Sequence, residues 1–283
     1  MPSNSPLNIK SLLADAVLAA KRAGEAIIEV YGSGFTVEQK EDRSPLTLAD
    51  KRSHEIISGH LQTLENPLPL LSEEGRDIPY TERRAWDYYW LIDPLDGTKE
   101  FVKKNGEFTV NIALMLRDRP VMGVVFLPVK DILYFAAEET GAYRISDTSW
   151  INNRLSLDEL QAKALRLPIK GEEGERTFTA IASRSHLSDE TSAYLETLKK
   201  EHGEIRTISA GSSLKFCLVA EGTADVYPRF APTMEWDTAA GQAVVEQSGG
   251  AVLQYETGCQ LRYNKENLLN PWFIVKGPGL KQA

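Results

Sequence analysis

Two aspartates lie three residues apart in the segment WLIDPLDGTKEF at residues 90–101. An apolar run of strand type leads to Asp93, and Pro94 predicts that the chain turns there because proline cannot donate a sheet hydrogen bond. Asp96 follows, and then Gly97, which allows close backbone approach or a positive φ. Two carboxylates on one tight turn repel each other unless a cation lies between them. Such oxygen ligands suit a hard ion such as Mg²⁺ rather than zinc.

Two further acidic motifs lie at the ends of expected elements. Glu73 and Glu74 close a short apolar run, as Asp93 closes its own run twenty residues later. Two strand ends that both terminate in carboxylates can lie side by side and form one acidic pocket. Asp237, in EWDTAAG, lies at an expected helix start, where the ordinary role of an aspartate is that of an N-cap. Each motif alone favours a solvated or capping acid, and only their combination favours a metal site.

The elements that position these acids follow from periodicity. Residues 7–31 have a helical apolar stripe, and a second helix is expected after Asp50. Residues 108–145 alternate apolar and polar with period two, which predicts an antiparallel meander. Strands and helices alternate from residue 178 to residue 275, as is typical of an α/β layer.

The polar stretch at residues 147–175 predicts a domain junction. We therefore expect an N-terminal α+β domain over residues 1–150, carrying most of the metal ligands. A C-terminal α/β domain over residues 151–283 would carry Asp237 and the residues that determine specificity.

Composition narrows the class of protein. With 283 residues, 42% hydrophobic and 25% charged, the chain is of ordinary globular type. A net charge of −8 argues against a nucleic-acid surface. A small anionic substrate remains compatible with this charge, since bound divalent ions invert the local field. Cys217 and Cys259 lack metal-ligand spacing and are expected to be reduced thiols. No signal peptide or membrane span is indicated.

The motif SRSH at residues 183–186 follows an expected strand. As a Ser-His hydrolase pair it fails, because neighbouring residues rarely point at each other and no orienting acid is identifiable. Contact with an anion through Ser183 and Arg184 is the alternative.

Together, the motifs SEEG, DPLDGT and WDTAAG resemble, in order and over nearly the whole chain, the metal-dependent, lithium-sensitive superfamily that includes inositol monophosphatases. Several longer segments are similar to one branch, the bacterial CysQ-type 3'(2'),5'-bisphosphate nucleotidases: DRSPLTLAD, YWLIDPLDGTKEF, SRSH and GSSLKFCLVAEGTADVYPRFAPTMEWDTAAG. The resemblance implies an α/β (α+β) layered sandwich in which an antiparallel meander half packs beside an α/β half, with the metal site at their junction.

The resemblance also implies a ligand set for two or three Mg²⁺ ions, with Li⁺ as an inhibitor. One ion would be shared by Glu73, Asp93 and the main-chain carbonyl of Leu95. Another would be shared by Asp93, Asp96 and Asp237. Such ions would neutralise a phosphate monoester and acidify the attacking water.

Thr98 and Asp42 resemble the family's water-activating pair, in which the aspartate accepts a proton through the threonine hydroxyl. Backbone N–H groups of Gly97 and Thr98, together with the start of the helix after Asp237, would hold phosphate oxygens.

Lys215 and Arg229 are candidate counterions for a second phosphate, and Ser183 and Arg184 are weaker candidates. Ordinary surface cations are the alternative for all of these basic residues. The full set expected to contact substrate is Glu73, Leu95, Asp96, Gly97, Thr98, Ser183, Arg184, Lys215, Arg229 and Asp237.

The leading hypothesis is therefore hydrolysis of the 3'-phosphate of 3'-phosphoadenosine 5'-phosphate, with the sulfated analogue as a further substrate. A monomer or homodimer in the cytoplasm is expected, with no nucleic-acid partner. The resemblance also implies peripheral association with the inner face of the bacterial inner membrane as a further expectation. The alternatives are an inositol or sugar-phosphate phosphatase and a non-catalytic metal or nucleotide sensor. Intact Asp42 and Thr98 argue against the sensor.

Overall fold

The computed structural model describes residues 7–32, 37–39, 45–169, 176–182 and 188–280. The described helices are α1 (Ile9–Tyr31), α2 (Leu48–Gln62), α3 (Tyr80–Arg83), α4 (Thr98–Val102), α5 (Leu157–Ala162), α6 (Asp189–His202), α7 (Leu214–Ala220) and α8 (Glu235–Gln247). The described strands are β1 (Val37–Gln39), β2 (Pro45–Thr47), β3 (Leu70–Ser72), β4 (Tyr88–Asp96), β5 (Thr109–Leu116), β6 (Arg119–Leu127), β7 (Ile132–Ala137), β8 (Gly141–Ser146), β9 (Leu165–Arg166), β10 (Phe178–Ile181), β11 (Ile205–Ile208), β12 (Val226–Arg229), β13 (Ala251–Gln254) and β14 (Phe273–Lys276).

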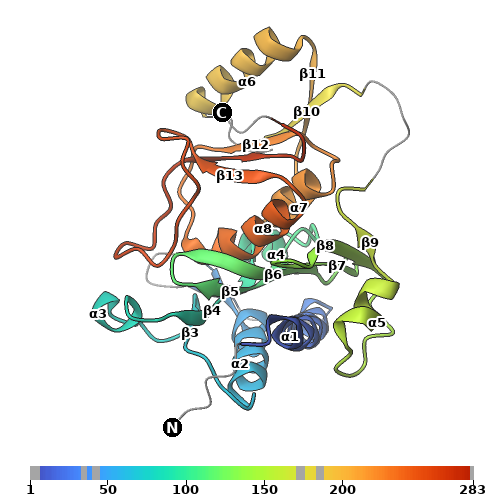
Figure 1. The fold of residues 1–283 in the computed structure, drawn as a ribbon, viewed down its shortest axis with the longest axis vertical. Helices are drawn as coiled ribbons and strands as arrows, with labels where there is room; N and C mark the ends of the chain where they lie inside the picture. The colour runs from blue at the N-terminus through green and yellow to red at the C-terminus, as the bar shows by residue number, and fades with distance from the viewer. Residues whose placement is uncertain (1–6, 33–36, 40–44, 170–175, 183–187, 281–283) are drawn as a thin grey trace.

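Helical and sheet layers alternate through the molecule (Figure 1). Helices α1 and α2 cover one face of a large sheet, and α7 and α8 cover its other face. Above α7 and α8 lies a smaller sheet, and α6 packs on the far side of that sheet. The order α/β/α/β/α confirms the expected layered sandwich and adds the order of its layers.

The large sheet has seven strands in the order β3-β4-β5-β6-β7-β8-β9. Strands β5 to β8 are antiparallel to their neighbours, which confirms the predicted meander. β3 alone in this sheet pairs in parallel, with β4. Because helices lie on both faces, β5 is buried over nearly its whole length rather than on alternate residues.

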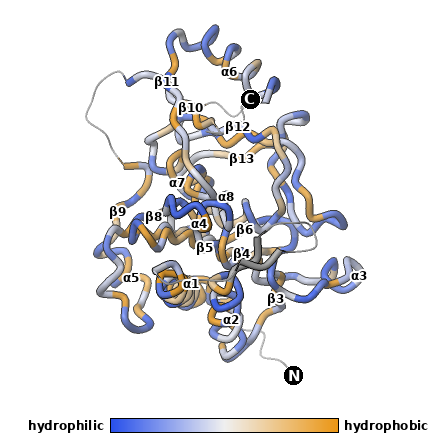
Figure 2. Tube along the Cα trace, turned by 180° about the vertical axis from the view of Figure 1, so that it is seen from behind, coloured by the Kyte–Doolittle hydropathy of each residue, from blue (hydrophilic) through white to orange (hydrophobic). Residues whose placement is uncertain are grey.

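The small sheet has five strands in the order β11-β10-β12-β14-β13. β10 pairs in parallel with β11 and β12, as the alternation of strands and helices predicts. β14 is antiparallel to both β12 and β13, so this sheet is mixed. Figure 2 shows that the outermost helix, α6, is largely hydrophilic, and it buries only Leu195 and Leu198 against the sheet.

α8 lies unusually close to the large sheet. A Cβ atom added to Gly123 of β6 would lie 2.3 Å from the carbonyl oxygen of Ala240, so only glycine fits there. Ala239, Ala240 and Ala243 on α8 are buried. The small residues after Asp237 therefore permit this close approach.

The two halves of the chain share one apolar core around α7 and α8, to which both sheets contribute. α5 packs against α1, and β9 continues the large sheet past residue 150. The domain boundary at that residue stays a prediction. None of the described helices combines the length and the apolar character that crossing a bilayer requires.

The last turn of α8 contains a half-buried acid, Glu246. Its Oε1 accepts hydrogen bonds from Gln242 Nε2 at 2.8 Å and Gln260 Nε2 at 2.9 Å. Burial outweighs these bonds and raises the pKa of Glu246 to about 7. The stability that this group contributes is complete below its unfolded pKa and is lost as pH rises through about 7.

Glu246→Gln is therefore expected to stabilise the protein at pH 8 by about 1–3 kcal/mol and to have little effect near pH 5. Thermal unfolding at both pH values measures the difference. Glu256→Gln, at an exposed position, removes the same charge and serves as the control. An equal gain at both pH values would contradict the assignment.

Candidate active site

The carboxyl ends of β3 and β4 bring two acids together. Ser72 pairs with Ile92 in the parallel ladder, and the N–H of Glu73 donates to the carbonyl of Ile92 at 3.3 Å. Glu73 and Asp93 therefore follow adjacent strand ends, as predicted. The side chain of Asp93 is 1% exposed.

The prediction that the chain leaves the sheet at Pro94 is wrong. β4 continues to Asp96, but its register with β5 shifts, since Asp93 pairs with Asn111 and Asp96 with Thr109. Three steps on β4 thus match two steps on β5, which is one extra residue and hence a β-bulge. In a regular strand, residues three apart face opposite sides of the sheet. The bulge removes this alternation and allows Asp93 and Asp96 to serve one site.

The bulged segment is held from both sides. The buried hydroxyl of Ser53, on α2, donates to the carbonyl of Pro94 at 2.7 Å. The hydroxyl of Ser212, before α7, donates to the carbonyl of Asp96 at 2.8 Å. Gly97 has a φ of +93°, and a Cβ atom there would lie 2.1 Å from Ser212 Oγ. Gly97 thus meets both expectations, a positive φ and close approach.

Asp237 comes from the other half of the chain, on α8. It is the third residue of the helix rather than the N-cap, because the helix begins at Glu235 and Met234 is the cap. The Oδ2 of Asp237 accepts from the N–H of Met234 at 2.8 Å, which fixes the carboxylate against the helix start. The expected N-cap role is therefore wrong, although the helix-start position is correct.

Burial and mutual repulsion act together on these acids. Burial raises the pKa of Asp93 well above its usual range, and the charges of Glu73, Asp96 and Asp237 raise it further. Burial and Asp96 raise the pKa of Asp237 to about 8. Burial also raises the pKa of Asp96, and the positive charge of Lys215 partly offsets this rise. The structure thus brings together all four predicted acids.

Within the described residues, no three His, Cys, Asp or Glu side chains have a geometry that would hold a metal ion as they lie. Asp93 accepts instead from the N–H of Leu95 at 3.1 Å, and Asp96 accepts from a threonine hydroxyl. The donor set nevertheless fits Mg²⁺, because these are hard oxygen ligands whose mutual repulsion in a buried site a cation relieves.

A buried polar chain links the two halves of the site, and we did not predict it. Thr109 Oγ1 lies 3.4 Å from Asp96 Oδ2 and 3.0 Å from Asn111 Oδ1. Asn111 Nδ2 donates to Ser213 Oγ at 3.0 Å, and that hydroxyl donates to the carbonyl of Asp237 at 2.7 Å. A signal was present in the sequence: two polar residues two apart, and hence on one face, in the apolar strand TVNIALML.

A cavity of about 640 Å³ opens beside the acids, and Asp96 and Asp237 form part of its wall. Lys215 and Arg229 line the same cavity, so these predicted cations lie at the site rather than on a remote surface. Lys215 Nζ lies 5.5 Å from the centre of the Tyr227 ring. Burial lowers the pKa of Lys215 to about 8, and the charge of Asp96 counteracts this effect.

The remaining predicted residues divide into two groups. Gly97 is the N-cap of α4, and Thr98 is its first residue, directly after Asp96. Asp42, Ser183 and Arg184 lie outside the described residues.

Comparison with known proteins agrees with this arrangement. The model of the inositol monophosphatase family matches residues 8–276. The chain belongs to the inositol monophosphatase family. A member of this family from Salmonella typhimurium, the 3'(2'),5'-bisphosphate nucleotidase CysQ, is 45% identical over 260 residues, covering 90% of this chain and 96% of that protein.

Solved structures of other proteins share the fold. The crystal structure of CysQ from Bacteroides thetaiotaomicron has a TM-score of 0.87 and 51% identity, covering 96% of this chain and 99% of that one. The extragenic suppressor protein suhB from Bartonella henselae has a TM-score of 0.71 and 25% identity, covering 95% of this chain and 94% of that one. These similarities confirm the resemblance to the CysQ-type branch.

Proposed function

We propose that this chain is a Mg²⁺-dependent 3'(2'),5'-bisphosphate nucleotidase that hydrolyses the 3'-phosphate of 3'-phosphoadenosine 5'-phosphate to give AMP and phosphate. The observation that carries the proposal is one cavity with two kinds of charge. Four acids gather at the end of β3, the bulge of β4 and the start of α8, and Lys215 and Arg229 line the cavity that opens beside them. The name of the Salmonella relative agrees with this activity.

Glu73, Asp93, Asp96, Asp237 and the carbonyl of Leu95 would hold the magnesium ions, two or three in number. When bound, Mg²⁺ neutralises the phosphate dianion and lowers the pKa of the attacking water. The chain itself contributes a buried site lined by acids, in which the attraction between carboxylates and a cation is stronger than in water. Separate contacts fix two of the segments that would carry these ligands, the bulge of β4 and the start of α8, while Glu73 comes from the end of β3.

Thr98 would orient the attacking water with its hydroxyl, and Asp42 would accept the proton through that hydroxyl. The positive φ of Gly97 turns the chain so that α4 starts at once after Asp96. Backbone N–H groups of Gly97 and Thr98 would then bind the phosphate oxygens. Attack in line leads to inorganic phosphate without a phosphoenzyme.

The second phosphate of the substrate would bind at Lys215 and Arg229. An inositol monophosphate has no group that needs these cations, and so their position in the cavity favours the bisphosphate. Tyr227, Phe230 and Phe273 also line the cavity and offer apolar surface to a nucleoside. The sulfated analogue carries the same nucleoside and 3'-phosphate and is expected to be a further substrate.

The function is tested by phosphate release from the adenosine bisphosphate, its sulfated analogue, inositol 1-phosphate and fructose 1,6-bisphosphate. We expect the highest kcat/KM with the adenosine bisphosphate, loss of release without Mg²⁺, and inhibition by Li⁺ at tens of millimolar. Faster turnover of inositol 1-phosphate at matched concentration would favour an inositol phosphatase instead. Nucleotide binding without any release would favour a sensor.

Arg229→Met is expected to raise KM for the adenosine bisphosphate by about 10- to 100-fold, because charge-assisted hydrogen bonds contribute about 1.5–3 kcal/mol. KM for 3'-AMP, which lacks the second phosphate, should change little. Steady-state kinetics with both substrates measure this difference. Arg206→Met, at an exposed position in β11, is the matched control. Equal losses with both substrates would contradict a role in binding the second phosphate.

The expected monomer or homodimer, the cytoplasmic location and peripheral contact with the inner membrane stay predictions. Sedimentation of the purified chain and fractionation of cells test them directly.

A further inference from the structure

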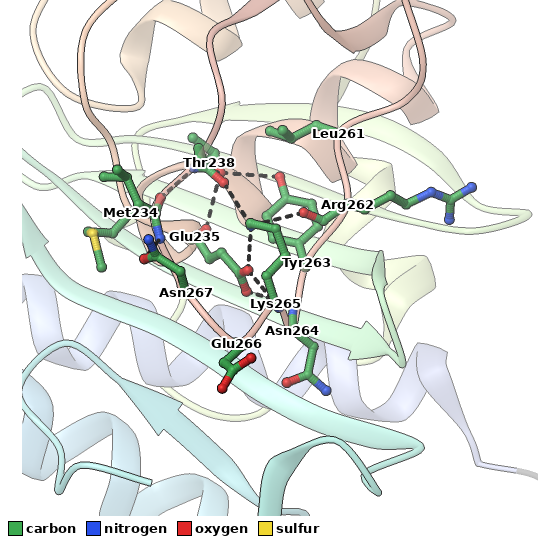
Figure 3. A network of polar contacts seen from close by, with 12 residues as sticks. Met234, Glu235, Thr238, Leu261, Arg262, Tyr263, Asn264, Lys265, Glu266 and Asn267 are labelled. Carbon is green, nitrogen blue, oxygen red and sulfur yellow. Dashed lines mark hydrogen bonds and ion pairs between the residues drawn. The ribbon is translucent and has the colours of Figure 1, made fainter. Parts of the chain in front are cut away.

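A buried carboxylate that the mechanism does not use lies two residues before Asp237. Glu235 is 0% exposed. Its Oε2 accepts from the N–H of Asn264 at 2.7 Å, and its Oε1 accepts from the N–H of Lys265 at 3.0 Å. Lys265 Nζ donates to the same Oε1 at 2.5 Å (Figure 3). The first residue of α8 is therefore tied to the loop at residues 261–270, which we call the clamp loop.

The clamp loop also holds the backbone that surrounds the helix start. The N–H of Glu235 donates to the carbonyl of Leu268 at 3.0 Å. Asn270 donates from its N–H to the carbonyl of Thr233 and from Nδ2 to the carbonyl of Met234, each at 2.8 Å. Met234 is the residue whose N–H holds the Asp237 carboxylate. The position of this metal-binding acid thus depends on the clamp loop.

The clamp loop is anchored in turn to the other half of the chain. Arg83, 2% exposed on α3, donates to Asn264 Oδ1 at 2.9 Å and to the carbonyl of Glu266 at 2.8 Å. Asn264 Nδ2 donates back to the carbonyl of Arg83 at 2.9 Å. α3 follows the strand end that carries Glu73. The contacts therefore run from the segment after Glu73, through the clamp loop, to the helix that carries Asp237.

Stability alone is a weak explanation for a charge buried at this place. Removing the Glu235 carboxylate from water costs free energy that its attraction to Lys265, whose side chain is 30% exposed, offsets only in part. The contacts instead fix the orientation of the helix start, because two backbone N–H groups and one ammonium all donate to the Glu235 carboxylate.

We propose that Glu235 is a positioning residue that, with Lys265 and the clamp loop, holds Asp237 in place for Mg²⁺ and thereby determines the affinity for the ion. The inference rests on the proposed function, since it assigns Asp237 to the metal site. Glu235 does not touch substrate and takes no part in proton transfer.

Two substitutions that change the charge in opposite directions distinguish a positioning role from a purely electrostatic effect on Mg²⁺ binding. Glu235→Gln removes a negative charge and Lys265→Met removes a positive charge, and both break the clamp. If Glu235 and Lys265 acted only through their charges, Lys265→Met would strengthen Mg²⁺ binding. Positioning predicts that both variants weaken Mg²⁺ binding, by about 10-fold, as is typical when an outer partner of a metal ligand is lost.

Mg²⁺ binding is measured by titration calorimetry and, independently, by the rise in melting temperature with added Mg²⁺. The kcat at saturating Mg²⁺ should recover toward the wild-type value, which a general loss of folded enzyme would not allow. The double variant should bind Mg²⁺ no more weakly than either single variant, because the two side chains act as a unit. Arg83→Met leaves the Glu235–Lys265 pair intact and should weaken binding about threefold, so a failure of Glu235→Gln to fold does not end the test.

Glu246→Gln is the matched control, because it makes the same chemical change on the same helix roughly 16 Å further along the axis. It should bind Mg²⁺ like the wild type. Wild-type affinity in Glu235→Gln, tighter binding in Lys265→Met, or equal weakening in Glu246→Gln would each overturn the positioning role. A wild-type chain that neither binds Mg²⁺ nor releases phosphate would instead overturn the proposed function, and the positioning role with it.

Discussion

Asp93→Asn is expected to abolish phosphate release while raising the melting temperature of the metal-free protein. Asp93 is 1% exposed, and burial followed by the charges of Glu73, Asp96 and Asp237 raises its pKa. Asparagine keeps the shape but removes one charge from this cluster, which relieves repulsion and weakens the ligand set. The rate should fall at least about a thousandfold, or about 4 kcal/mol of transition-state stabilisation.

Phosphate release and thermal unfolding, each with and without Mg²⁺, measure both parts of this prediction. Added Mg²⁺ should raise the melting temperature of the wild type and have much less effect on the variant. Asp158→Asn, at an exposed position in α5, removes the same charge away from the ligand set and should behave like the wild type. Release at the wild-type rate by Asp93→Asn would refute the metal assignment.

Thr98→Ala is expected to bind the adenosine bisphosphate normally and to lose about two to three orders of magnitude in kcat. Thr98 is the first residue of α4, directly after Gly97. Alanine keeps the backbone N–H that would contact phosphate and removes only the hydroxyl that would orient water. Calorimetric titration of the bisphosphate and single-turnover kinetics separate binding from chemistry.

Thr98→Ser is the natural companion variant, because it restores a hydroxyl on the same backbone. It should recover most of the rate. An unchanged kcat in Thr98→Ala, or a serine variant as slow as the alanine variant, would rule out the proposed role of the hydroxyl in orienting water.

Local patterns were sufficient to predict most of the elements. The apolar stripe at residues 7–31 predicted α1, and period-two alternation predicted the meander that became β5 to β8. The pairing of acid-terminated strands was also predictable, since Glu73 and Asp93 end similar apolar runs. These features depend on side chains that are close in sequence, and so a single sequence contains them.

The polar support of the site was much less predictable. Ser53 and Ser212 look like ordinary helix or loop residues until the fold brings each against the bulge. The same is true of Glu235, whose partners Asn264 and Lys265 lie about thirty residues away. Hydrogen bonds between distant segments leave no periodic trace, because any serine or glutamate satisfies the local pattern equally well.

By itself, then, the sequence determined the set of acids, their order along the chain and the strand or helix on which each one lies. Only the tertiary structure shows how Asp93 and Asp96, three residues apart on one strand, come to the same place, because the bulge that removes their alternation exists only in the pairing of β4 with β5. It also shows how Asp237 reaches them, since α8 approaches the large sheet where Gly123 leaves room for Ala240. The physical reason is common to both: strand register and close packing are properties of two segments in contact, and neither segment specifies them alone.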